Sequence, residues 1–91
     1  EQTMANQDLP MYEQLAQESY RLGAKFSESR SKAEAAYYAH KAAPSDATMA
    51  IRKALSAENN ADYDAYSASI KAYEAELKAH EARENAENDD D

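Results

Sequence analysis

Three side chains near the C-terminus have the spacing of a metal site. Glu76, His80 and Glu84 lie four residues apart, so a helix would place them on one face. Imidazole and carboxylate groups suit Zn²⁺ or Mn²⁺. However, no second histidine lies four residues from His80, and the surrounding sequence has the alanine content of a surface helix. We therefore interpret the three residues as part of a solvated face, and we expect no metal ion and no cofactor.

The other candidates for chemistry are equally sparse. His40 could titrate near neutral pH, but its place near the end of a predicted helix favours an interaction with the helix dipole. Asp62 and Asp64 are two residues apart and would point to different helix faces, unlike an acid–base pair. The chain has no cysteine and one glycine, Gly23, which excludes thiol chemistry and glycine-rich phosphate loops. We expect no catalytic residues and no enzymatic activity.

The composition predicts helices as the elements that carry these residues. The chain has 91 residues, with 21 alanines, two threonines, two isoleucines and no valine. Alanine, glutamate and lysine favour helices, and so few β-branched residues cannot form several strands. We expect one all-α domain, either an antiparallel helical hairpin or a three-helix array with coiled-coil-like packing and an acidic C-terminal tail.

Breaks in the pattern set the expected boundaries. Pro44 disfavours helix at Ala43, and Ser45 or Asp46 can cap the helix that follows. Asn59 and Asn60 predict a second break, either a turn or a kink, because asparagine competes for backbone hydrogen bonds. The expected organisation is a flexible lead at 1–8, a helical domain at 9–86 with helices at about 9–42, 46–58 and 61–86, and an acidic tail at 87–91.

A seam of large side chains is the most informative pattern. Five residues of the last predicted helix have the alternating spacing of three and four that is typical of a coiled coil: Tyr63, Tyr66, Ile70, Tyr73 and Leu77. Four residues of the first predicted helix are expected opposite them: Tyr12, Leu15, Leu22 and Phe26. Gly23 lies on the same stripe, where it would allow close backbone approach.

These residues predict a function in protein binding. The chain has only 18 large apolar or aromatic side chains, and seven of them are tyrosines. Burying each contributes roughly 1.5–3 kcal/mol, which barely offsets the cost of ordering the chain. We therefore expect a non-catalytic interaction module, an adaptor, scaffold or regulatory subunit, that gains stability from a protein partner or from self-association.

The charge distribution supports an alternative. The net charge is -8, with -4 over residues 1–20, +3 over residues 21–41 and -8 over residues 54–91. An antiparallel hairpin would place acidic residues beside basic ones. Carboxylates along a rod could also imitate DNA phosphates, as in an inhibitor of a DNA- or RNA-binding protein such as a phage could encode. The candidates are Asp62, Asp64, Glu74, Glu76, Glu81, Glu84, Glu87, Asp89, Asp90 and Asp91. So acidic a chain is not expected to bind nucleic acid directly.

The sequence has no membrane or targeting signal in the residues present. No run of about 18 apolar residues and no signal-peptide pattern occurs. The lack of cysteine fits a reducing compartment, and we expect a cytoplasmic protein. The first residue is Glu1, so a targeting segment could have preceded it.

Overall fold

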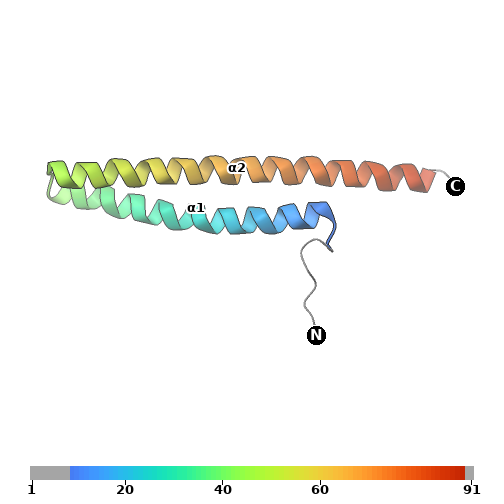
Figure 1. Ribbon diagram of the computed structural model, residues 1–91, viewed down its shortest axis with the longest axis horizontal. Coiled ribbons are helices and arrows are strands. Elements are labelled where there is room, and N and C mark those ends of the chain that lie inside the picture. Colours follow the sequence, from blue (N-terminus) through green and yellow to red (C-terminus); the bar gives the residue numbers. More distant parts are fainter. Residues whose placement is uncertain (1–8, 90–91) are drawn as a thin grey trace, which may run out of the picture.

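Two long helices lie side by side in the computed structural model, which describes residues 9–89 (Figure 1). Helix α1 spans Met11–Ala42 and helix α2 spans Asp46–Asp89. They run antiparallel and form an elongated hairpin. Within the described residues no strand is present. The all-helical prediction and the hairpin alternative are confirmed, and the predicted lead at 1–8 lies outside the described part of the chain.

The turn between the helices forms where Pro44 predicts it. The backbone N–H of Thr48 donates to Ser45 Oγ at 3.0 Å, and the backbone N–H of Ser45 donates to Thr48 Oγ1 at 3.0 Å. This reciprocal pair satisfies amides that the first turn of α2 leaves without helical partners. The His40 ring at the end of α1 lies 2.7 Å from the same threonine hydroxyl, measured from Nδ1. Ser45 is thus the cap of α2.

The predicted break at Asn59 and Asn60 is wrong, and with it the three-helix array, because α2 continues through both residues. The Asn59 side-chain amide donates to Ser29 Oγ at 3.0 Å and to the Phe26 carbonyl at 3.3 Å, both on α1. The amide is therefore engaged across the hairpin and does not compete for the backbone of its own helix. Tertiary packing overrides the local preference of asparagine.

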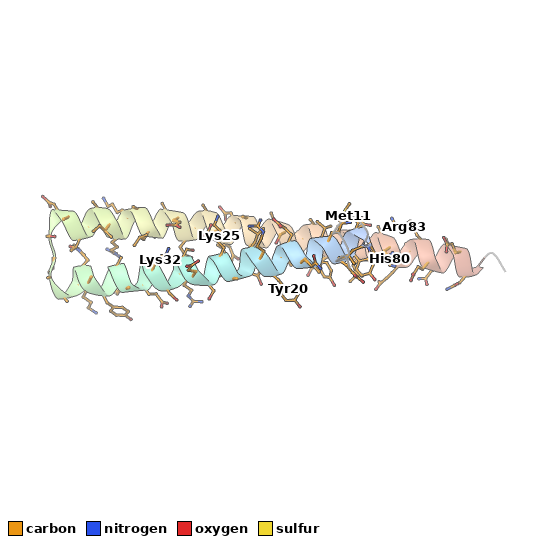
Figure 2. The ribbon with its side chains drawn as sticks, turned by 60° about the horizontal axis from the view of Figure 1, so that its bottom comes forward. Met11, Tyr20, Lys25, Lys32, His80 and Arg83 are labelled. Atoms are coloured by element: carbon orange, nitrogen blue, oxygen red, sulfur yellow. The ribbon has the colours of Figure 1, made fainter. Side chains whose placement is uncertain are left out.

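The C-terminal end of α2 extends beyond its partner. Tyr12, in the first turn of α1, meets His80 of α2 with ring centroids 4.6 Å apart. Figure 2 accordingly shows Met11, His80 and Arg83 together at the open end of the hairpin. Residues 81–88 are exposed and project past the start of α1. The expected helix end near residue 86 and the expected acidic tail from 87 are corrected, because the helix includes Asp89; Asp90 and Asp91 lie outside the described residues.

Candidate protein-interaction surface

The face between the helices is built from small and polar side chains. Ser29, Ala36, Asp62 and Ser69 are its buried residues, with Ser29 only 3% exposed. The Ser19 hydroxyl donates to Ser69 Oγ at 3.1 Å and thereby joins the helices. No side chain in the described residues is both large and fully buried. The hairpin therefore closes around polar contacts and does not form a packed apolar core.

Asp62 lies inside this face, although the sequence suggested an acidic surface position. Its side chain is 10% exposed, and its Oδ1 lies 3.7 Å from the Lys25 ammonium of α1. Its other oxygen, Oδ2, is buried without a hydrogen-bond partner. Asp62 is buried because the register of the two helices turns position 62 towards α1, as it does Asn59 and Ser69. The pair also confirms that the hairpin places an acidic residue of α2 beside the basic half of α1.

Aromatic rings cover the middle and the open end of the hairpin. Phe26 packs against Tyr63 and Tyr66 of α2, with centroid distances of 5.4 and 5.9 Å. Tyr12 packs against His80. Desolvation of the Tyr12 hydroxyl, aided by the nearby Glu13 carboxylate, raises the pKa of Tyr12 above its ordinary value. These contacts fix the register of the two helices.

The predicted seam on α2 is rotated from the observed contact face. Tyr63 contacts Phe26 of α1 from the edge of this face. The residues nearer its centre include Asn59, Asp62, Tyr66, Ser69 and His80. Their spacing of three and four equals that of the predicted seam, and both series contain Tyr66. The sequence thus contains a second series of the same period, made mostly of polar residues, beside the more conspicuous series of large side chains.

The rotation leaves part of the predicted seam beside the contact face. Tyr63 and Ile70 directly follow Asp62 and Ser69, which are turned towards α1. Leu77 directly follows position 76, which lies seven residues after Ser69 and therefore on the same side of α2. Tyr63 is 52% exposed, whereas Ile70 and Leu77 are half-buried. Tyr66 and Tyr73 are half-buried, as are the four expected residues of α1, which are Tyr12, Leu15, Leu22 and Phe26.

One side of the hairpin is consequently lined by a row of residues spaced by seven. We call this row the Tyr63 flank; it consists of Met49, Ser56, Tyr63, Ile70 and Leu77. Beside it on α1, Ala16 and Tyr20 line a shallow hollow of about 250 Å³ together with Ile70 and Tyr73. Tyr20 is 81% exposed and projects from the outer edge of α1 (Figure 2). The side of the hairpin along the Tyr63 flank therefore presents aromatic and aliphatic groups to solvent.

Several acidic candidates have basic partners within the hairpin. Glu76 Oε2 lies 2.9 Å from an Arg83 guanidinium nitrogen, and Glu84 Oε2 lies 3.1 Å from His80 Nε2. The remaining acidic side chains with described exposure are exposed, namely Asp64, Glu74, Glu81 and Glu87. The carboxylates are thus distributed over several faces of α2, and Glu81, Glu84 and Glu87 lie past the start of α1.

The predicted stack of Glu76, His80 and Glu84 does not act as one group, because Glu76 pairs with Arg83 and Glu84 pairs with His80. Among residues 9–89, no three side chains of the metal-binding types come together as ligands.

No helix in this part of the chain has an apolar stretch long enough to cross a bilayer. Comparisons of the chain with protein families, curated proteins and solved structures found no match. A functional hypothesis must therefore start from the surface geometry.

Proposed function

We propose that this protein is a non-catalytic protein–protein interaction module, an adaptor, scaffold or regulatory subunit, that binds through the Tyr63 flank. The observation that carries the proposal is the partial exposure of the large side chains on this flank. Serines and Asp62 occupy the buried positions between the helices, while Tyr63 stays 52% exposed. A hairpin that leaves rings and aliphatic groups partly exposed along one side is suited to bury them against another protein.

The energetics favour this use of the flank. Full burial of a large apolar side chain contributes roughly 1.5–3 kcal/mol, and the flank residues realise only part of that within the hairpin. Tyrosine brings a large contact area at a low entropic cost, and its hydroxyl can stay at a wet rim. Two straight helices also offer the geometry in which an apolar row lies along the groove of a partner.

A pair of matched variants tests the proposal. Ile70→Glu places a charge on the Tyr63 flank, whereas Ile51→Glu places the same charge on an exposed site, 54% accessible, that is not part of the flank. We expect Ile70→Glu to weaken capture of the partner on the immobilised chain at least tenfold and Ile51→Glu to leave it unchanged. Circular dichroism should show equal helix content. Equal binding by wild type and Ile70→Glu, or an equal loss for both variants, would contradict the proposal.

Ionic strength separates this function from imitation of nucleic acid by the acidic residues. Binding through apolar side chains should survive about 0.5 M salt, whereas binding through exposed carboxylates should weaken steeply because the charges are screened. Removing residues 84–91 should likewise spare the Tyr63 flank and remove much of the acidic extension. Asp62, Glu76 and Glu84 already face basic or imidazole groups of this chain, which reduces the set available to a basic partner.

A further inference from the structure

We infer that the occupant of the Tyr63 flank is a second copy of this chain, packed antiparallel about a two-fold axis that passes beside Tyr63. The inference rests on the proposed function, because it names the partner of the same surface. The result would be a four-helix assembly in which each α2 lies along the α2 of the other copy.

The first argument is the symmetry of the flank. Its five positions are centred on Tyr63, with Ser56 and Ile70 seven residues away on either side and Met49 and Leu77 fourteen residues away. An antiparallel two-fold axis at Tyr63 therefore brings Leu77 against Met49 of the second copy. It also brings the branched Ile70 against the small Ser56. In an isologous interface the same patch must complement itself, and this row does so in bulk.

A neighbouring row has the same symmetry in charge. Lys53, Asn60, Ser67 and Glu74 follow one another at intervals of seven residues. Lys53 and Glu74 are both exposed, and in this arrangement the ammonium of one faces the carboxylate of the other copy. Asn60 faces Ser67, so polar groups meet polar groups. A like-charged pair, Glu81 with Asp46, falls at the exposed ends, where solvent screening is strongest.

The elongated hairpin has enough exposed area for a further interface. A folded monomer of 10.1 kDa is expected to expose about 5300 Å². This chain exposes 6790 Å². A stable interface of ordinary size removes about 800 Å² from each partner, which lies within this excess.

Charge at the two ends favours antiparallel over parallel packing. The turn end, residues 36–53, carries three bases and one acid. The open end, residues 9–18 and 71–89, carries eight acids and three bases. Antiparallel packing joins the positive end of one copy to the negative end of the other. Parallel packing would bring the two negative ends together, which electrostatic complementarity disfavours.

The oligomeric mass is the first test. Sedimentation equilibrium of the full chain should give about 20 kDa, twice the chain mass of 10.1 kDa. Ile70→Glu should give the mass of a monomer, and Ile51→Glu should remain a dimer. A wild-type mass of one chain at every concentration tested would overturn the inference.

Cysteine cross-linking tests the direction of packing, and the absence of native cysteine makes the result clean. Side chains in contact can form a disulfide when their Cα atoms lie about 4.4–6.8 Å apart. Met49→Cys mixed with Leu77→Cys should give a disulfide-linked dimer under mild oxidation, whereas Met49→Cys alone should not. Efficient cross-linking of Met49→Cys alone would show a parallel dimer and overturn the arrangement.

Charge reversal tests the register. Lys53→Glu and Glu74→Lys should each weaken dimerisation by about fivefold, and the double variant should restore it. The two residues are about 32 Å apart along one helix, so they cannot pair within a chain. Failure of the double variant to restore the affinity would contradict the register.

The outcomes separate the two proposals. A monomeric protein that captures a different partner, with the capture sensitive to Ile70→Glu and not to Ile51→Glu, overturns this inference and leaves the proposed function standing. A monomer whose partner binding is insensitive to Ile70→Glu overturns both.

Discussion

Gly23→Ala is predicted to destabilise this helix, although the same exchange stabilises most helices. In an open helical position alanine is favoured over glycine by about 1 kcal/mol. At Gly23 a Cβ atom would lie 2.9 Å from Cε1 and 3.3 Å from Cζ of the Tyr66 ring. That ring is stacked on Phe26, with centroids 5.9 Å apart, so it cannot move without disturbing a second contact.

The magnitude follows from two opposing effects. Overpacking of this kind costs about 1–3 kcal/mol. With the propensity gain of about 1 kcal/mol subtracted, the net loss is about 1 kcal/mol. For a chain of this length that corresponds to a melting temperature about 4–8 °C lower. Thermal and urea unfolding should be followed by circular dichroism at one protein concentration, because association would otherwise shift the midpoint.

A double-mutant cycle isolates the contact. In a Tyr66→Ala background the obstructing ring is gone, so Gly23→Ala should stabilise by about 1 kcal/mol, a coupling of about 2 kcal/mol between the sites. Ala24→Gly, at the exposed neighbouring position, is the control for propensity alone and should cost about 1 kcal/mol. The reasoning is refuted if Gly23→Ala stabilises the wild-type background, or if its effect is the same with and without the tyrosine ring.

Three further predictions concern the polar contacts. Asn59→Ala removes two hydrogen bonds between the helices and should destabilise by about 1 kcal/mol; an unchanged urea midpoint would show that these bonds contribute nothing. Thr48→Ala breaks the reciprocal cap with Ser45 and should cost about 1 kcal/mol by thermal unfolding; an unchanged melting temperature would show that the cap does not stabilise the hairpin. Hydrogen bonds from Arg21 lower the pKa of Glu18 below its ordinary value of 4.5, so the pair stabilises the folded state above the unfolded pKa and this contribution is lost as the pH falls through the folded pKa. Carboxyl NMR titration should show that Arg21→Gln raises this pKa, and an unshifted titration would disprove the pairing.

Local chemistry was sufficient to predict the turn and the helical content. Pro44 cannot continue a helix, and Ser45 lies where a capping hydroxyl is needed, so both effects act within a few residues. The beginning of α1 and the position of the turn therefore agree with the sequence to within two residues. The sequence also predicts that an antiparallel hairpin places acidic residues of the last segment beside the basic half of the first helix, and Lys25 with Asp62 is one such pair, although Asp62 itself was expected on the surface.

Tertiary contacts decided the features that the sequence did not reveal. Asn59 breaks helices when its amide is free, and only the presence of Ser29 on the facing helix shows that it is engaged. The orientation of α2 is not evident from the sequence for a related reason, because its large apolar side chains predict a different inward face from the one that its smaller polar residues form. In a two-helix protein a single interface has to be closed, and small residues such as Ser69 allow the helices to approach while Tyr63 and Ile70 remain on the side.

Site-specific photo-cross-linking tests the central proposal most directly. A photoreactive phenylalanine analogue at position 63 lies on the Tyr63 flank, and the same group at Ala65 lies on an exposed site two residues away and outside the flank. In the source cells, irradiation should yield one discrete adduct from position 63 and none from position 65. Absence of an adduct from position 63, or the same adducts from both positions, would contradict the claim that this flank meets another protein.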